Sequence, residues 1–260
     1  MSPSPEPTTP RRPPALTARD ISLRYGPVQA LASVSIDVPS GTLLAIVGES
    51  GSGKTSLLRC FNRIVTPDAG AVLIDGQDVR EMDAVTLRRR IGYVPQSGGL
   101  LPHWTVERNV ALVPRLNAHP DPQRAARAAL ERCGLPVSKF GARLPHELSG
   151  GQRQRAAIAR ALAASQDVLL LDESFGALDA ISRNELLDAF TTLRTEVGFT
   201  CVMVTHDLGE AARLADAIAV MRAGTIEQVG SLATLRDAPA TPYVGELLAR
   251  AQAAARVLCG

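Results

Sequence analysis

The chain has 260 residues, enough for one or two domains and for a full hydrophobic core. Its formal net charge is +2, and only 3% of its residues are aromatic, so neither property fits a nucleic-acid-binding surface. The four scattered cysteines show no metal-ligand spacing and are typical of a protein from a reducing compartment.

Residues 1–14 contain six prolines among serines, threonines and arginines, a composition that predicts a disordered tail. No apolar run reaches the ~18–20 residues that a membrane span needs. The N-terminus also lacks the apolar segment of a secretory signal. We therefore expect no membrane span or signal, and a folded domain over residues 15–240 followed by a C-terminal helix over residues 241–260.

Hydrophobic periodicity predicts an alternation of strands and helices before residue 97. In chain order, these are half-buried strands at 21–23 and 34–38, a continuous apolar strand at 43–47, a helix at 55–64, and short strands at 71–75 and 91–94. A continuous apolar run that stops at a glycine is typical of a buried parallel strand feeding a loop.

Prolines then punctuate Ala- and Arg-rich helical pieces over residues 97–164, among them Pro102, Pro114, Pro120, Pro122 and Pro136, and we interpret this region as an inserted helical lobe. Beyond it, the predicted elements are buried strands at 168–171 and 201–204 with a helix at 182–197 between them, a hairpin at 218–221 and 225–229, and a closing helix at 243–258. This alternation predicts an α/β fold with a parallel sheet and right-handed crossovers.

A phosphate-binding motif stands between the predicted strand at 43–47 and the helix that follows. The segment reads Gly48, Glu49, Ser50, Gly51, Ser52, Gly53, Lys54, Thr55, and Ser56 comes next. It matches GxxxxGK[ST] in the strand-loop-helix context that confirms this motif. Its backbone N–H groups should hold the phosphates of ATP, with Lys54 reaching the β- and γ-phosphates and Thr55 binding Mg²⁺.

An acidic pair, Asp172 and Glu173, follows the buried strand at 168–171. A carboxylate at the end of a parallel strand lies at the crevice where ligands bind, beside the phosphate loop. We expect Asp172 to hold Mg²⁺ through water and Glu173 to orient or deprotonate the attacking water. Taken alone, the acidic pair would be interpreted as an ordinary strand end. The phosphate loop earlier in the chain favours a catalytic role for the pair.

Leu148, Ser149, Gly150, Gly151 and Gln152 precede an Arg- and Ala-rich helix. Ser149 and Gly151 place a hydroxyl and a backbone N–H at the helix start, which makes a second anion site or a simple N-cap. If this segment and the phosphate loop lie on separate lobes, one subunit cannot bring both to one γ-phosphate.

These motifs, followed by Thr205, His206 and Asp207, resemble the ABC-type ATPases over roughly residues 16–229. The resemblance implies a P-loop NTPase fold with a mixed, largely parallel sheet, an N-terminal antiparallel β subdomain and an inserted helical lobe. It also implies a head-to-tail dimer. In that dimer Ser149, Gly150, Gly151, Gln152 and Asp179 complete the ATP site of a second copy.

The resemblance assigns further site residues. Tyr25 would stack on adenine, Gln96 would sense Mg²⁺ and the γ-phosphate, and His206 would contact the γ-phosphate. The family usually has proline where this chain has Ser174. We expect hydrolysis to survive this change, because proline contributes rigidity and no ligand.

Non-transport ABC ATPases fit poorly, because the chain lacks their coiled coils, zinc cysteines or second ATPase unit. We therefore interpret a single unit without membrane spans as the ATPase subunit of a transporter. We expect it to bind a separate permease and to lie peripherally on the cytoplasmic face of the cell membrane. Residues 87–116 and 174–183 resemble the ATPase subunits of osmoprotectant importers, which take up glycine betaine, carnitine, choline or proline. That implies an indirect link to an extracytoplasmic solute-binding protein.

Alternatives remain. Leu100, Leu101, Trp104 and Val106 could receive a coupling helix of the permease or form lobe core. The cargo could be amino acids or other solutes, or the transporter could export. A member of another class would be an ATP-gated clamp with little hydrolysis, although Glu173 and His206 favour turnover.

Overall fold

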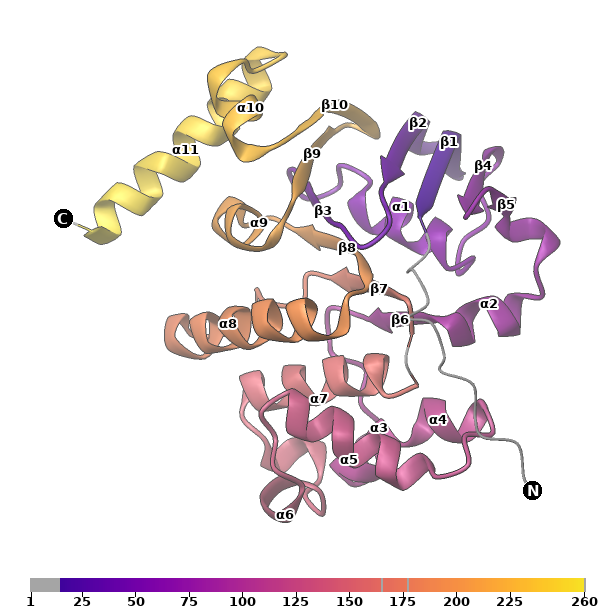
Figure 1. Ribbon diagram of the computed structural model, residues 1–260. Coiled ribbons are helices and arrows are strands. Elements are labelled where there is room, and N and C mark those ends of the chain that lie inside the picture. The colour runs from indigo at the N-terminus through magenta and orange to yellow at the C-terminus, as the bar shows by residue number, and fades with distance from the viewer. Residues whose placement is uncertain (1–14, 165, 177, 260) are drawn as a thin grey trace, which may run out of the picture.

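The computed structural model describes residues 15–164, 166–176 and 178–259 (Figure 1). The tail predicted for residues 1–14 lies outside the described residues. A six-stranded sheet forms the centre of the molecule. In pairing order its strands are β10 (Thr225–Gly230), β9 (Ala217–Arg222), β3 (Leu43–Val47), β8 (Thr200–Thr205), β7 (Val168–Asp172) and β6 (Ile91–Val94).

Five strands of this sheet, from β9 to β6, run parallel, and β10 pairs antiparallel with β9. Every residue of β3, β7 and β8 is buried, which explains their continuous apolar sequences. The predicted parallel sheet and closing hairpin are therefore confirmed.

A second sheet is antiparallel and lies beside the first (Figure 1). Its strands, in pairing order, are β2 (Val28–Val38), β1 (Leu16–Tyr25), β4 (Ala69–Ile74) and β5 (Gln77–Asp78). β1 and β2 are longer than the strands predicted from alternation. The pairing shifts between Ala18 and Ile21 and again before Leu23, and both Asp20 and Ser33 have positive φ. These bulges break the period-2 pattern, so the sequence revealed only part of each strand.

Helix α1 (Lys54–Phe61) packs between the two sheets. Its Leu57, Leu58 and Phe61 are fully buried in one hydrophobic cluster with residues of β1, β3 and β8. The helix ends before the predicted residue 64, because Asn62 forms its C-cap and Arg63 adopts a left-handed backbone.

Every regular element over residues 97–164 is helical. These are α3 (Val106–Val110), α4 (Leu112–Leu116), α5 (Pro122–Arg132), α6 (Val137–Phe140), the 3₁₀ turn Pro145–Glu147 and α7 (Gly150–Leu162). They gather at the end of the molecule away from the antiparallel sheet (Figure 1). Small alanines on α5 and α7, such as Ala126 and Ala156, are fully buried where these helices pack.

The remaining helices include α8 (Ala180–Val197) between β7 and β8, α9 (Leu208–Leu214), α10 (Leu232–Asp237) and α11 (Pro242–Cys259). The helix predicted at 182–197 is thus confirmed as α8, and the closing helix is α11. The 3₁₀ turn Val79–Glu81 and helix α2 (Ala84–Arg90) were not predicted. Among the described residues, no helix combines the length and apolar character that crossing a membrane requires.

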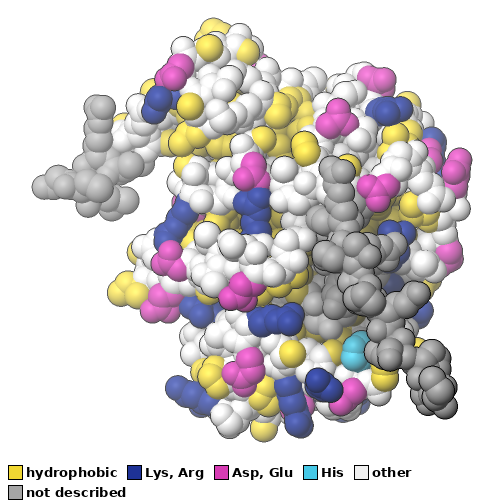
Figure 2. Space-filling model, in the orientation of Figure 1, with side chains coloured by type: hydrophobic (Ala, Val, Ile, Leu, Met, Phe, Trp, Pro, Cys, Tyr) yellow, Lys and Arg dark blue, Asp and Glu magenta, His cyan; other side chains and the backbone are white. Residues whose placement is uncertain are grey.

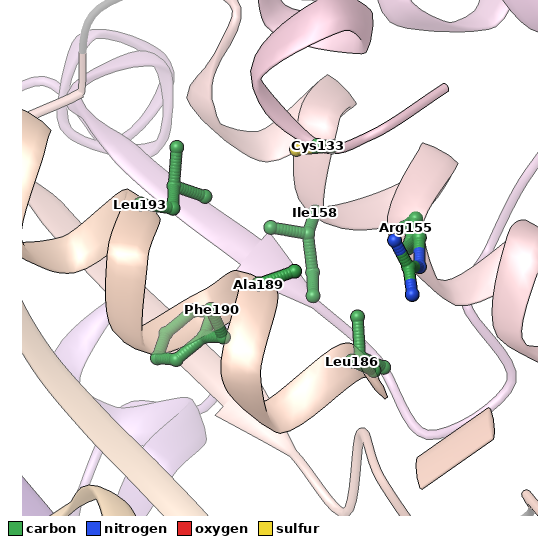
Figure 3. A pocket seen from close by; sticks show the side chains of 7 residues that line it. All are labelled: Cys133, Arg155, Ile158, Leu186, Ala189, Phe190 and Leu193. Carbon is green, nitrogen blue, oxygen red and sulfur yellow. The ribbon is translucent and has the colours of Figure 1, made fainter. Parts of the chain in front are cut away.

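The contact between α7 and α8 is apolar and nearly filled. Figure 3 shows Ile158 of α7 beside Leu186 and Phe190 of α8. A cavity of about 10 Å³ remains there, room for at most one water. Cys133 also lines this cavity, and burial raises the pKa of its thiol to about 12, as expected for an inert cysteine. On the face in Figure 2, charges of both signs are interspersed over the described surface, in keeping with the balanced composition.

The segment leading into α3 is held by one buried amide. Asn109 is fully buried, its Nδ2 donates to the carbonyls of Leu101, Trp104 and Thr105, and its Oδ1 accepts from the Leu101 N–H at 2.7 Å. Val106 is fully buried in the core of the helical lobe, so it cannot contact a permease. Leu101 and Trp104 are half-buried and keep some accessible surface.

We predict that Asn109→Ala lowers the free energy of unfolding by about 2–3 kcal/mol, because it leaves buried backbone groups without partners. Asn117→Ala is the matched control, since Asn117 is exposed and its side chain makes only a long hydrogen bond of 3.5 Å, to the Arg89 carbonyl, among the described residues. Urea unfolding followed by circular dichroism measures both. Equal losses in the two variants would contradict this role.

Candidate active site

The phosphate loop runs from the end of β3 to the start of α1. Gly53 caps α1 with φ of 101°, a backbone conformation that favours glycine. A Cβ at Gly48 would lie 2.1 Å from the Met221 carbonyl oxygen, so the loop also needs glycine for its close approach to β9. The conformation of the phosphate loop therefore depends on its own glycines and on the close approach of β9, a distant part of the chain.

Lys54 folds back over its own loop. Its Nζ donates to the carbonyls of Gly48 at 2.8 Å and Glu49 at 2.7 Å and lies 3.4 Å from the Ser52 Oγ. Burial lowers the pKa of Lys54, while the Glu173 and Asp172 carboxylates act against that shift. A buried ammonium among neutral carbonyls gains by exchanging them for phosphate oxygens, since charge-assisted bonds are stronger.

Two of the three residues predicted to bind Mg²⁺, Thr55 and Asp172, lie against each other, whereas the third, Gln96, bonds to Glu173. The Thr55 Oγ1 donates to the Asp172 Oδ1 at 2.8 Å, and the Tyr93 hydroxyl donates to the Asp172 Oδ2 at 3.1 Å. The Arg59 guanidinium lies 3.9 Å from the same Oδ2. The described residues contain no cluster of three or more His, Cys, Asp and Glu side chains that could enclose a metal. A hydroxyl next to one carboxylate fits Mg²⁺, which binds through few carboxylates together with phosphates and water.

The three predicted catalytic side chains lie together: Gln96 and His206 both approach one oxygen of the Glu173 carboxylate. The Gln96 Nε2 donates to the Glu173 Oε2 at 2.9 Å, and the His206 Nδ1 lies 3.6 Å from the same oxygen. Glu173 has φ of 46° and its N–H donates to the Val204 carbonyl at 2.9 Å. Left-handed backbone is uncommon for residues other than glycine and persists at functional sites where the surroundings impose it. The ends of β6, β7 and β8 thus bring these three residues together.

Ser174, where the family pattern usually has proline, makes a contact that proline cannot. It is buried, and its Oγ donates to the Val94 carbonyl at 3.4 Å. This hydroxyl therefore links the end of β7 to the end of β6, two residues before Gln96.

Ser149 and its neighbours form a capping box at the start of α7. The Ser149 Oγ accepts from the Gln152 N–H at 3.3 Å, and the Gln152 Oε1 accepts from the Ser149 N–H at 3.1 Å. Within a single chain, Ser149 therefore acts as the N-cap of α7. No hydrogen bond or ion pair between described residues joins residues 149–152 to the phosphate loop. Their action on a second copy's ATP stays a prediction.

Two other predicted residues are exposed. Tyr25, at the end of β1, is 48% exposed, which is enough for an adenine ring to stack on its aromatic ring. Asp179 caps α8 by accepting the Ser182 N–H at 2.9 Å, and that bond lowers the pKa of its carboxyl. Beside it the large apolar side chain of Ile181 is 74% exposed.

The sequence did not reveal two tyrosines at the site. Tyr93 could have been found by the rule that located Asp172, since it too lies near the end of a predicted parallel strand. Tyr243 had no such signal. It comes from α11, its hydroxyl accepts the Glu49 N–H at 3.3 Å, and the Arg222 guanidinium lies 4.6 Å from its ring centre.

A phosphate loop, a Thr55–Asp172 pair and a carboxylate beyond the adjoining strand define the class of P-loop nucleotide-binding proteins. Residues 31–176 match the family model described as ABC transporter, and the chain belongs to this family. The recognition made from the motifs is confirmed.

Several relatives are subunits of importers by name. The chain is 42% identical over 237 residues to the choline transport ATP-binding protein OpuBA of Bacillus subtilis, covering 90% of this chain and 62% of that protein. It is 39% identical to the glycine betaine uptake system ATP-binding protein YehX of Escherichia coli, covering 92% of this chain and 78% of that protein. It is also 46% identical to the sulfate/thiosulfate import ATP-binding protein CysA of Mycobacterium tuberculosis, covering 90% and 66%. The chain therefore spans about three fifths of the length of OpuBA.

The fold is similar to that of a bacterial ABC transporter cassette, MJ0796, solved as a dimer. That comparison has a TM-score of 0.76 at 30% identity and covers 84% of this chain and 98% of the cassette. The same cassette in a post-hydrolysis state bound to ADP and Pi gives a TM-score of 0.75. The predicted fold class, an α/β P-loop fold with a mixed, largely parallel sheet, an antiparallel β sheet and a helical lobe, is confirmed.

We predict that Lys54→Met weakens ATP binding about 10- to 100-fold, because the triphosphate loses its charge-assisted partner. Lys139→Met is the matched control, since Lys139 is the only other lysine of the sequence and is exposed on α6. Titration with a fluorescent ATP analogue measures both affinities. An unchanged affinity in Lys54→Met would contradict the role of this ammonium.

Proposed function

We propose that the chain is the ATP-hydrolysing subunit of an ABC importer that drives uptake of a small solute through a separate permease. The observation that carries this proposal is the meeting of Gln96 and His206 at Glu173, next to the Thr55–Asp172 pair. A clamp that does not hydrolyse would need no carboxylate poised in this way. The MJ0796 cassette bound to ADP and Pi supports turnover in the same fold.

In this proposal each residue has one task. Thr55, Asp172 and Gln96 would hold Mg²⁺, and Lys54 would bind the β- and γ-phosphates of ATP. Bound Mg²⁺ would supply positive charge to neutralise the phosphates. Glu173 orients the attacking water and accepts its proton, which suits a carboxylate that keeps partial exposure and hydrogen-bonding partners.

The site is completed by a second copy of the chain. Residues 149–152 and Asp179 would act on the partner's nucleotide. Three observations support this arrangement: the exposed N-cap Ser149 of α7, the exposed Ile181 beside Asp179, and the similarity to a cassette solved as a dimer. A helix start offers free N–H groups to a γ-phosphate without a further cation.

The cargo that the relatives favour is a quaternary-amine osmoprotectant, because the names of two of them refer to choline and glycine betaine. Sulfate is the second candidate, since the sulfate/thiosulfate relative is 46% identical.

The chain would lie on the cytoplasmic face of the membrane, bound to its permease, with a solute-binding protein outside. Half-buried Trp104, with the Arg108 guanidinium 4.2 Å from its ring centre, is a candidate contact for the permease. Thermal shifts of the co-purified binding protein with choline, glycine betaine, sulfate and amino acids would separate the cargoes.

We predict that Glu173→Gln still binds ATP but accumulates as a dimer, since the isosteric amide cannot accept the proton of the attacking water. Size-exclusion chromatography with ATP and Mg²⁺ measures the dimer. Glu81→Gln, at an exposed carboxylate, is the control and should elute as the parent does. A Glu173→Gln chain that stays monomeric and hydrolyses ATP normally would refute the proposed function.

We also predict that Ser149→Arg lowers ATP hydrolysis about 100-fold, the size of effect seen when a donor to the reacting group is lost. Binding of ATP to the single chain should stay within about twofold, since Ser149 lies outside its own phosphate loop. Ser231→Arg is the matched control, because Ser231 also caps a helix by accepting a backbone N–H, that of Thr234. Equal activity in both variants would count against the shared site.

A further inference from the structure

One arginine contacts two loops of the site that the sequence motifs treat separately. Arg183 lies in the first turn of α8, and its Nη2 donates to the Gly176 carbonyl at 3.3 Å and the Leu178 carbonyl at 3.1 Å. Its Nη1 donates to the Asp207 Oδ2 at 3.5 Å. The first two contacts hold the segment between Glu173 and Asp179, and the third holds the residue after His206.

The third contact reaches into the start of α9. Asp207 caps this helix by accepting the N–H groups of Gly209 and Glu210. An arginine can serve these acceptors together because its planar guanidinium carries five donors in a rigid fork. A side chain needed only for charge balance would not require that geometry.

A further contact is close but incomplete. The Arg183 Nε lies 3.8 Å from the Glu210 Oε1, and within the described part of the chain both atoms are buried without a hydrogen-bond partner. An approach of roughly 1 Å would turn this pair into a charge-assisted hydrogen bond. Burial raises the pKa of Glu210, and the Thr205 hydroxyl and Arg183 act against that shift. Unpaired buried donors and acceptors are costly, so the arrangement gains when the first turns of α8 and α9, which carry these two residues, draw together.

We propose that Arg183 is a positioning residue that links the loop carrying Asp179 to the loop carrying His206, so that docking of Asp179 on a second copy is transmitted to His206. This inference rests on the proposed function for its catalytic consequence. The link itself is a property of the single chain. Arg213 of α9 already bonds to α8, and Arg194 of α8 contacts the Leu214 carbonyl and Asp216 at the end of α9. Simple anchoring of the two helices therefore does not require Arg183.

Arg213 provides the matched control. It joins α9 to α8 by donating to the Asn184 Oδ1 and the Asp188 Oδ1, and it contacts neither loop of the site. Arg213→Met therefore removes an arginine of similar exposure from the same pair of helices. A difference between the two variants reports on the loops and not on helix packing.

The first measurement is amide hydrogen exchange of the full chain without nucleotide. In Arg183→Met, residues 178–179 and 205–210 should both exchange at least about threefold faster than in the parent, and Arg213→Met should leave both segments unchanged. Faster exchange in one segment alone, or in neither, would overturn the link.

The second measurement is steady-state ATP hydrolysis by the full chain. Arg183→Met should lower kcat at least about tenfold while the affinity of the single chain for ATP stays within about twofold, and Arg213→Met should keep kcat within about twofold. A kcat within twofold of the parent in Arg183→Met would overturn transmission to His206. If the parent chain itself does not hydrolyse ATP, the proposed function is refuted instead. The hydrogen-exchange data would still test whether Arg183 links the loops that carry Asp179 and His206.

Arg183→Lys separates the planar fork from the charge. It should keep the fold and still lower kcat at least about threefold, because one ammonium cannot reproduce the fork. Full activity and parental exchange in Arg183→Lys would reduce Arg183 to a charge and overturn the proposal. If Arg183→Met does not fold, the lysine variant decides alone.

Discussion

Parallel pairing in register brings the ends of four strands to one edge of the central sheet, and the site stands on that edge. Val47 pairs with Thr205, Asp172 with Val204, and Val94 with Leu171. The residues that follow these positions are the phosphate loop, Glu173, Gln96 and His206. Their spacing is therefore a property of the sheet hydrogen bonds and not of the loops themselves. A shift of one residue in β6, β7 or β8 would separate Glu173 from Gln96 or His206.

The charges at this edge stabilise one another before any nucleotide binds. Lys54 bonds to carbonyls of its own loop, and Asp172 receives hydrogen bonds on both oxygens from Thr55 and Tyr93. Groups held in this way need little rearrangement when charge develops during reaction, which is the basis of electrostatic preorganisation. The same bonds explain why a buried ammonium and a buried carboxylate are tolerated in a core made mostly of aliphatic side chains.

Two arginines join this edge to the helices that carry the segments proposed to act on a second copy. Arg160, on the helix that Ser149 begins, donates to the carbonyls of Gly98 and Gly99, just beyond Gln96. Arg183, on the helix that Asp179 begins, holds the loops around His206. Each helix thus has an exposed N-cap residue, Ser149 or Asp179, and an arginine within the helix that contacts the site. A rigid helix is a suitable connection between the two, because its backbone hydrogen bonds are satisfied internally.

The amino-acid sequence by itself determined the phosphate loop, the Asp172–Glu173 pair, the parallel sheet and the hairpin, because each depends on a local motif or on the periodicity of one segment. Gln96 and His206 came from a family resemblance, and the tertiary structure then showed why they matter, by bringing both to Glu173. Only the tertiary structure decided the left-handed Glu173, the bulged β1–β2 hairpin, and the contacts of Tyr93, Tyr243 and Arg183. These rest on hydrogen bonds between residues that are often far apart in the chain, as Glu49 and Tyr243 are, and no local pattern records which distant donor will meet which acceptor.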